Sequence, residues 1–452
     1  MARVVVISPP FHSHARPLAA VGAALSRQGA HVHLACTPAF AGLATRSGLG
    51  FTELAVTRNA NHGIAETTEQ DQDEAGRLRE FLDATHHGAV ATLLTQARHR
   101  GDDMLADPEG VLHDLAVLDR ELRPDWYLVD QLSYSATLAL HCLDLPYATF
   151  CPGHPSYLPT TPDAWFGLPY AWPEALRPAP ADLDRLRTAA AANDAAFTGA
   201  FRAFTRRHAP HRPEPDRAFA LRSPHAVLFN YPRLPWLPPA PAGPPALYAG
   251  HLVPPGDPSP APLDEHWQAV VSRLSAGRRP LVLVALGTFL SARHDVLATA
   301  TAGILRHTPA SVIVAAGDRV TEVTTHPLLR AAAAPGRLHI APAVPQQDLL
   351  PHTAAMVHHG GNNSFTECLR AGVPALVLPF SSDQFAIAHD AERAALGRSL
   401  DPNTLTPEAA GTTVAALLAG QAHGIPALSA GLQSLGPAWA ASRLLRQMPA
   451  RP

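Results

Sequence analysis

A short stretch in the last quarter of the chain gathers a histidine, two glycines, a serine and a carboxylate around one bend. His359 is followed by two glycines and two asparagines, and then by Ser364 and Glu367. Glycines let a ligand approach the backbone closely, and the free amides and dipole at the start of a helix attract anions. His359 and Ser364 can donate to phosphate oxygens, and Glu367 can accept from two neighbouring hydroxyls. The stretch therefore predicts a site for a nucleoside diphosphate that carries a ribose, built without lysine and without metal.

Two simpler interpretations of the same stretch stay open. Ser364 and Glu367 have the spacing of a capping box, in which the serine precedes a helix and no ligand is needed. His358 and His359 could hold a metal ion together. Because neighbouring residues of a strand point to opposite faces, one ion would not easily reach both rings, and we expect no metal site.

The bend needs a strand before it and a helix after it, and the chain supplies both in a repeated order. Short apolar runs rich in β-branched residues alternate with amphipathic stretches, as in an α/β protein. The expected strands are residues 3–8, 31–36, 126–130, 147–150, 280–287, 311–317, 338–342, 354–359 and 374–380. Strands that are apolar on both faces predict parallel sheets covered by helices, with ligands at the carboxyl ends of the strands.

Length and proline content predict how the chain divides. At 452 residues it is too long for one ordinary core, and prolines concentrate in residues 231–264. We expect two Rossmann-like α/β domains that face each other across a cleft. The expected parts are an N-terminal domain in residues 1–235, a proline-rich linker in residues 236–264, a C-terminal domain in residues 265–430, and a closing helix in residues 431–452 that packs back on the N-terminal domain.

The composition excludes several classes of protein. The chain is 46% hydrophobic and 16% charged with a net charge of −3, which is typical of a soluble globular protein without nucleic-acid or membrane-surface partners. It contains no lysine, so a Walker A loop, a protein kinase and Schiff-base or pyridoxal chemistry are excluded. The four cysteines are scattered and no signal-peptide pattern precedes the first strand, so we expect a cytoplasmic protein with reduced thiols.

The order of the residues around the bend resembles the C-terminal signature of the family 1 glycosyltransferases, the UDP-glycosyltransferases of GT-B fold. The two-domain layout agrees with that family along the whole chain. The matching residues are, in order, Pro345-Gln346, His359, Gly361, Asn363-Ser364, Glu367, Gly372-Val373-Pro374 and Asp383-Gln384. The resemblance implies the GT-B fold and a transferase of the bacterial natural-product type.

The resemblance also implies which part of the donor each residue contacts. His359, Ser364 and the amides of the bend would contact the diphosphate, and Glu367 the ribose. Asp383 and Gln384 would bind hydroxyls of the sugar. The residues implied to bind the nucleotide sugar are Gly287, Thr288, Val344, Gln346, His359, Gly361, Asn363, Ser364, Glu367, Asp383 and Gln384.

Two positions depart from the family pattern. Ala343 stands where an aromatic residue often stacks on the base, and Asn362 stands where many relatives carry Trp or Met. Both departures concern selectivity for the base. The resemblance implies a UDP-sugar as co-substrate, and the two departures leave a dTDP-sugar as the second choice. No other cofactor and no metal are expected.

A base is also needed, because the acceptor must lose a proton as it attacks the sugar, and a histidine near neutral pKa suits this task. The family spacing of a histidine three residues before a proline falls on His14 and Pro17. Asp130 ends an expected strand and matches the aspartate that orients the base in the family. His12 is the competing candidate. The helix that carries His14 is expected to have Ser13 as its N-cap and to stop at Gly29. The implied reaction is an inverting displacement without a metal.

Residues 147–172 hold seven aromatic side chains, which favours an apolar acceptor pocket beside His14. The residues expected to line it are Phe150, Tyr157, Trp165, Phe166 and Tyr170. Ordinary packing of a long loop explains the same composition equally well. With a pocket, the acceptor is a flat or apolar small molecule such as a polyketide or macrolide alcohol.

Two alternatives have the same fold: a sugar-nucleotide epimerase, which needs no acceptor, and a nucleotide-binding helper protein, which needs no base. The presence of His14, Asp130 and Glu367 favours the transferase. The sequence does not determine the sugar, the acceptor, the type of bond, or whether the protein is a monomer or a homodimer.

Overall fold

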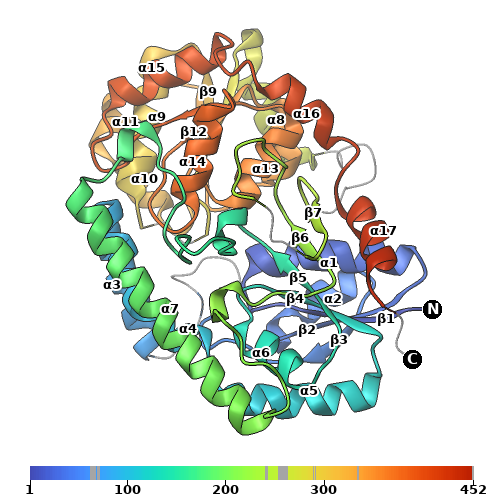
Figure 1. The fold of residues 1–452 in the computed structure, drawn as a ribbon. Helices are drawn as coiled ribbons and strands as arrows, with labels where there is room; N and C mark the ends of the chain where they lie inside the picture. Colours follow the sequence, from blue (N-terminus) through green and yellow to red (C-terminus); the bar gives the residue numbers. More distant parts are fainter. Residues whose placement is uncertain are drawn as a thin grey trace.

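The computed structural model describes residues 1–61, 68, 72–239, 243–252, 263–288, 290, 292–332 and 335–449. Within these residues the chain forms two parallel sheets, each covered by helices, one above the other in Figure 1. This is the predicted pair of Rossmann-like domains. No helix in the described part of the chain is long and apolar enough to cross a membrane.

The N-terminal sheet has seven parallel strands in the order β3-β2-β1-β4-β5-β6-β7. The strands are β1 (Arg3–Ile7), β2 (His31–Cys36), β3 (Gly50–Glu53), β4 (Trp126–Asp130), β5 (Tyr147–Cys151), β6 (Val227–Phe229) and β7 (Ala246–Tyr248). The four long runs predicted as strands are confirmed. The linker prediction is wrong in one respect, since β7 lies within it: Ala246 to Tyr248 contain no proline and can pair with β6 at the edge of the sheet.

The helices of the N-terminal domain are α1 (His12–Arg27), α2 (Ala41–Arg46), α3 (Gln72–His86), α4 (Ala89–Met104), α5 (Pro108–Leu122), α6 (Tyr134–Cys142) and α7 (Pro180–His208). Helices α1 and α2 pack on one face of the sheet, and α5 and α6 pack on the other. The expected N-cap at Ser13 is wrong. Helix α1 starts at His12, and its N-cap is Phe11, which offers no side-chain cap. The amide of His12 is satisfied instead by the carbonyl of Asn61, next to an isolated bridge between Phe11 and Asn61. The predicted stop is confirmed, with Gly29 at a φ of 92° directly after the helix.

The C-terminal sheet has six parallel strands in the order β10-β9-β8-β11-β12-β13. The strands are β8 (Leu281–Ala285), β9 (Ser311–Ala315), β10 (Leu338–Ala341), β11 (Ala355–His358), β12 (Ala375–Val377) and β13 (Gly397–Ser399). The helices of this domain are α8 (Glu265–Leu274), α9 (His294–His307), α10 (Val320–Thr325), α11 (Pro327–Ala331), α12 (Gln346–Leu349), α13 (Asn362–Ala371), α14 (Gln384–Arg393) and α15 (Pro407–Leu418).

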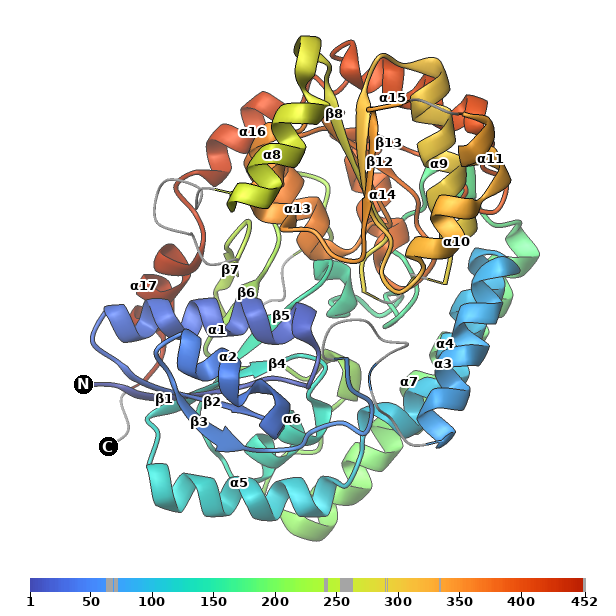
Figure 2. The same ribbon diagram turned by 180° about the vertical axis from the view of Figure 1, so that it is seen from behind.

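The chain ends with α16 (Ile425–Leu432) and α17 (Pro437–Gln447). Helix α17 returns to the N-terminal domain and lies beside α1, as Figure 2 shows. Ala440, Ala441 and Leu444 are fully buried there in the same core as Leu18 and Val21 of α1. The predicted closing helix is confirmed.

A buried carboxylate joins the two domains. Asp390 of α14 is fully buried and accepts hydrogen bonds from His154 Nε2 (3.0 Å), Tyr231 (2.9 Å), Trp236 (2.8 Å) and the hydroxyl of Tyr170. Burial alone would raise the pKa of Asp390, but the hydrogen bonds from His154, Tyr170 and Trp236 hold it below its ordinary value. Asp390 is therefore ionised and has donors on both carboxylate oxygens.

Candidate active site

His14 and Asp130 meet at the carboxyl edge of the N-terminal sheet. Strands β1 and β4 are neighbours, so the first turn of α1 and the last residue of β4 lie side by side. His14 Nδ1 is 2.9 Å from Asp130 Oδ2, and the other carboxylate oxygen accepts from the amide of Leu132 at 2.9 Å. Asp130 is fully buried, while the side chain of His14 is 16% exposed. This geometry keeps the proton on Nδ1 and leaves Nε2 as the basic nitrogen.

His12 is less suited to act as a base. Burial lowers the pKa of its ring, and the positive charges of Arg16 and Arg46 lower it further. Among the described residues no carboxylate lies within hydrogen-bonding distance of the ring. Within the described part of the chain, His12 therefore has no carboxylate to orient it.

The bend after β11 is built around the ring of His359. A Cβ atom on Gly287 would lie 2.5 Å from the His359 ring, and one on Gly361 would lie 2.3 Å from it, so both positions require glycine. Within the described part of the chain, His359 Nδ1 is buried and has no hydrogen-bond partner. Burial lowers the pKa of His359 to about 4, so the ring is neutral near pH 7. A buried nitrogen without a partner is suited to an incoming oxygen atom of a ligand.

Helix α13 begins at the same point and leaves its first amides free. Its N-cap is Gly361, without a side-chain cap, and Ser364 is the third residue of the helix. The capping-box interpretation is therefore wrong, because Ser364 does not precede the helix. The amide groups of the first turn have no partners inside the helix and carry its positive dipole end.

Glu367 lies one turn further and is held by two glutamines. It accepts from Gln346 Nε2 at 2.5 Å and from Gln347 Nε2 at 2.8 Å, one bond on each carboxylate oxygen. Burial raises its pKa, and the two glutamines oppose that effect. Gln346 also donates to the Ser364 hydroxyl at 3.2 Å. Val344, two residues before Gln346, is half-buried and packs on the hydrophobic cluster that contains Leu349 and Cys368.

Asn363 connects the two domains instead of facing a ligand. Its Nδ2 donates to the carbonyl of Ser13 at 2.8 Å, and its Oδ1 accepts from Asn230 Nδ2 at 3.0 Å. Both ends of the amide are therefore occupied by groups of the N-terminal domain. Gly287 and Thr288 follow β8 of the C-terminal domain. The hydroxyl of Thr288 accepts a hydrogen bond from Asn61 Nδ2 of the N-terminal domain at 3.2 Å.

The start of α14 carries the two residues expected to bind the sugar, with Asp383 as the N-cap and Gln384 as the first helical residue. Asp383 is partly buried, its Oδ2 accepts from the amide of His154 at 2.8 Å, and burial raises its pKa. The side chain of Gln384 instead stabilises the turn before α14, since its Oε1 accepts hydrogen bonds from the amides of Phe380 (2.8 Å) and Ser381 (3.2 Å). Asp383 is the better placed of the two to contact a ligand.

Three of the five aromatic residues expected in the acceptor pocket pack into the protein interior. Phe150 is fully buried in the N-terminal core, and Phe166 stacks on Phe219 at 4.7 Å within an aromatic cluster. Tyr170 donates to Asp390 and stacks on His154. These three predictions are corrected, because Phe150 belongs to strand β5, Phe166 packs against aromatic residues of other elements, and Tyr170 is bound to Asp390 of the C-terminal domain.

Trp165 and Tyr157 differ from the other three. Trp165 lies under the guanidinium of Arg217, 4.8 Å from the ring centre. The hydroxyl of Tyr157 is buried and has no partner in the described part of the chain.

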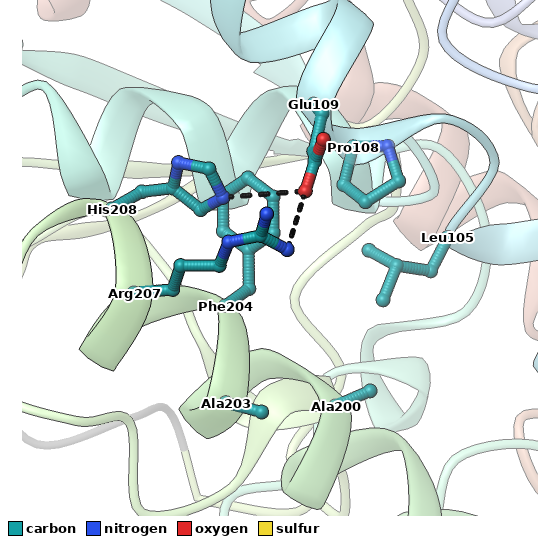
Figure 3. A pocket seen from close by; sticks show the side chains of 8 residues that line it. All are labelled: Leu105, Pro108, Glu109, Ala200, Ala203, Phe204, Arg207 and His208. Atoms are coloured by element: carbon teal, nitrogen blue, oxygen red, sulfur yellow. Dashed lines mark ion pairs between the residues drawn. The ribbon is translucent and has the colours of Figure 1, made fainter.

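A cavity of about 290 Å³ lies away from all of these groups, between α7 and the start of α5 (Figure 3). Glu109 lies at its edge and pairs with Arg207 (3.0 Å) and His208 (3.5 Å). None of the expected site residues line this cavity. No cluster of three or more potential metal ligands occurs among the residues that the structure describes.

Several residues of the site were not expected from the sequence: Asn61, His154, Asn230 and Gln347. His154 and Asn230 follow β5 and β6, at the same edge of the sheet as Asp130. Their place after a strand was a signal that could have identified them. Asn61 and Gln347 carry no such signal.

Residues 297–432 match the model of the "Erythromycin biosynthesis protein CIII-like, C-terminal domain" family. Among curated proteins, a demethyllactenocin mycarosyltransferase of Streptomyces fradiae is 32% identical over 130 residues, which is 29% of this chain and 27% of that protein. The first curated relatives are all matched over less than a third of their length.

Solved structures match over nearly the whole chain. The glycotransferase of kitacinnamycin has a TM-score of 0.68 at 21% identity, covering 99% of both chains. Glycosyltransferase VinC in complex with dTDP has a TM-score of 0.65 at 20% identity, again covering 99% of both. Spinosyn rhamnosyltransferase SpnG, complexed with spinosyn aglycone, has a TM-score of 0.60 at 21% identity and covers 98% of this chain and all of its own. These likenesses show the GT-B fold.

Proposed function

We propose that this chain transfers a sugar from a nucleoside diphosphate to a hydroxyl group of a natural product. Its GT-B fold and its C-terminal domain identify it as a family 1 glycosyltransferase of the erythromycin CIII-like type. The observation that carries this proposal is the pairing of His14 with Asp130 at 2.9 Å. A protein that only bound a nucleotide would have no use for an oriented, partly exposed base.

The base acts through its free nitrogen. Asp130 keeps the Nδ1 proton in place, so His14 Nε2 takes the proton of the acceptor hydroxyl. The hydroxyl oxygen then attacks the anomeric carbon from the side opposite to the diphosphate, and the bond to the diphosphate breaks with inversion. Asp130 stabilises the imidazolium that forms.

The leaving diphosphate is received by the C-terminal domain. The first amides of α13 and the ring of His359 supply donors to its oxygens, and the helix dipole offsets part of its charge. This arrangement needs no lysine, in accord with a chain that has none.

For the donor we propose a dTDP-sugar, in place of the UDP-sugar expected from the sequence. The solved neighbours include VinC with dTDP and SpnG with thymidine diphosphate. Each carboxylate oxygen of Glu367 accepts one hydrogen bond from a glutamine and keeps a further acceptor site for a sugar hydroxyl of the nucleoside. Ala343 leaves space beside the base.

For the acceptor we propose a polyketide-derived alcohol. SpnG has been solved with the spinosyn aglycone, and the curated relative acts on demethyllactenocin. Trp165 and Tyr157 are the aromatic residues left to contact it. An acceptor of this class would expose its hydroxyl beside His14.

One assay tests the proposal. The protein is incubated with dTDP-glucose, dTDP-rhamnose or UDP-glucose and a panel of macrolide and polyketide aglycones, and the products are identified by mass spectrometry. We expect a mass increase of one sugar that requires both a donor and an aglycone. Conversion of the donor in samples without aglycone would instead indicate an epimerase or hydrolase, and no turnover of any kind would contradict the proposal.

A further inference from the structure

The turn that carries Asp383 contains a residue in an unusual backbone conformation. Ser382 has a φ of 54°, in the left-handed region that residues other than glycine rarely adopt. Such conformations persist only when surrounding contacts hold them, and they concentrate at functional sites. The contacts that hold Ser382 therefore decide where the next residue, Asp383, points.

Those contacts come from the other domain. Gln96, on α4 of the N-terminal domain, accepts from the amide of Ser382 through Oε1 at 3.2 Å and donates to the Ser382 hydroxyl through Nε2 at 2.8 Å. One side-chain amide thus binds both polar groups of Ser382 at once. Ser382 and Gln96 are both partly buried, so neither bond lies fully in solvent.

Asp383 is itself bound from the same domain. Its Oδ2 accepts from the amide of His154, and a Cβ atom on Gly153 would lie only 2.4 Å from that oxygen. One carboxylate oxygen is therefore fixed against the N-terminal domain, and Oδ1 is the oxygen left for a ligand. The direction of Oδ1 depends on the backbone of the turn.

Gln96 is not the only residue that docks α3 and α4 on the C-terminal domain. The carbonyl of Thr85 accepts from Arg293 at 3.0 Å and from Asn403 at 2.9 Å, and Arg293 is buried there. These contacts lie at the junction of α3 and α4, apart from the turn. The docking of the two helices and the bonds to Ser382 can therefore be tested separately.

We propose that Gln96 is a positioning residue for sugar recognition. It holds Ser382 in its left-handed conformation and thereby fixes the direction in which Asp383 presents Oδ1 to the donor sugar. The inference rests on the proposed function and on the role expected from the sequence, in which Asp383 binds a hydroxyl of the donor sugar. If Gln96 acts in this way, the N-terminal domain takes part in binding the donor sugar.

The test compares the affinities of dTDP-glucose and of dTDP alone, measured by calorimetry, in four proteins besides the wild type. Gln96→Ala removes both bonds, Asn403→Ala removes only a docking contact, Asp383→Ala removes the sugar contact, and the fourth combines Gln96→Ala with Asp383→Ala. We expect Gln96→Ala to weaken dTDP-glucose binding about 5- to 30-fold, as for one or two lost hydrogen bonds, and to change dTDP binding less than about twofold. Asn403→Ala should leave the ratio of the two affinities unchanged.

The double variant shows whether Gln96 acts through Asp383. If it does, Gln96→Ala weakens binding no further once Asp383 is an alanine. Additive losses, or an equal loss for dTDP and dTDP-glucose in Gln96→Ala, would overturn the proposal. Gln96→Met, which keeps the volume of the side chain, replaces Gln96→Ala if that variant does not fold.

Failure of the inference and failure of the proposed function give different results. If Asp383→Ala weakens dTDP-glucose binding and Gln96→Ala does not, the inference alone is wrong. If Asp383→Ala leaves dTDP-glucose binding unchanged, the proposed sugar contact is wrong and the inference falls with it.

Discussion

His14 works as a base only while a proton occupies the nitrogen that faces Asp130. We predict that His14→Ala lowers kcat by a factor on the order of 10² to 10⁴, the usual effect of losing a general base. Binding of dTDP should be unchanged, because the diphosphate bend lies in the other domain. Steady-state kinetics and calorimetry check both statements. His12→Ala is the control, and a larger loss in the control than in His14→Ala would identify His12 as the base.

Asp130 sets the tautomer, so a neutral amide in its place tests that role alone. Asp130→Asn can still accept from the amide of Leu132, and the fold should persist. Its amide nitrogen can donate to His14 Nδ1 and so place the proton on Nε2, the wrong nitrogen for a base. We predict that kcat falls on the order of 10²-fold or more while the thermal midpoint stays close to that of the wild type. A rate equal to the wild type would remove Asp130 from the mechanism.

Glu367 accepts one hydrogen bond on each carboxylate oxygen, and substitutions there can show whether the protein prefers dTDP or UDP. We predict that dTDP binds the wild type at least as tightly as UDP, as the proposed dTDP-sugar donor requires. Glu367→Gln should weaken both nucleotides about tenfold or more, as for a lost charged hydrogen bond of roughly 1.5–3 kcal/mol. Competition binding at one pH and salt concentration measures this. A tenfold preference for UDP would restore the UDP-sugar as donor.

At the scale of the elements, the last residue of β11 predicts how stability depends on pH. His358 is fully buried, and burial lowers its pKa to about 3. Below pH 6.5 the unfolded chain takes up a proton there and the native protein does not, so stability falls as pH falls. His358→Asn can still accept from the amide of Gly360 but does not titrate. We predict that the wild type loses about 2 kcal/mol relative to this variant between pH 7 and pH 5, measured by urea denaturation. If the free energies of unfolding of the two proteins change equally between pH 7 and pH 5, the prediction is wrong.

The contact between α17 and α1 makes a second prediction at this scale. Leu444 is fully buried in the N-terminal core although it lies eight residues from the end of the chain. Leu444→Ala should lower the free energy of unfolding by about 2–5 kcal/mol through lost burial and a cavity. Arg446→Ala, on the same helix, is the control and should have little effect, since among the described residues Arg446 bonds only Ser442, at an exposed position. Equal stabilities in denaturant would show that α17 is not part of the folding unit.

The sequence predicted long elements better than short ones, for a physical reason. Runs of four or more apolar residues such as 281–285 form buried central strands, and their composition shows it. Strands β7 and β13 have three residues each, and they form because a neighbouring strand offers its edge. That information lies in the partner strand and not in the short strand itself.

The same limit applies to the site. Pattern, spacing and the family resemblance proposed His14, Asp130, His359 and Glu367, and the structure places each at or directly after the end of a strand or in the first two turns of a helix. They did not show that Asn363 faces Ser13, because that contact depends on how the two domains meet. Nor did they show that Phe166 lies inside an aromatic cluster. Order along the chain predicts which edge of a sheet a residue occupies, but not which neighbour it faces.

For the whole molecule, the proposed site exists only where the two domains touch. The N-terminal domain supplies the base, and the C-terminal domain supplies the groups for the diphosphate. Asn363 and Thr288 bind across the boundary, close to both. The distance between the base and the bend is therefore a property of the interface and not of either domain.

Asp390 has a consequence for attempts to recombine this protein with its relatives. Its four donors all come from the N-terminal half and the segment that follows it, while the carboxylate comes from the other half. A chimera that exchanges one half for that of a relative without an equivalent of His154, Tyr170, Tyr231 and Trp236 would bury a charge with no donors. Useful crossover points must keep these five residues together, or must exchange all five at once.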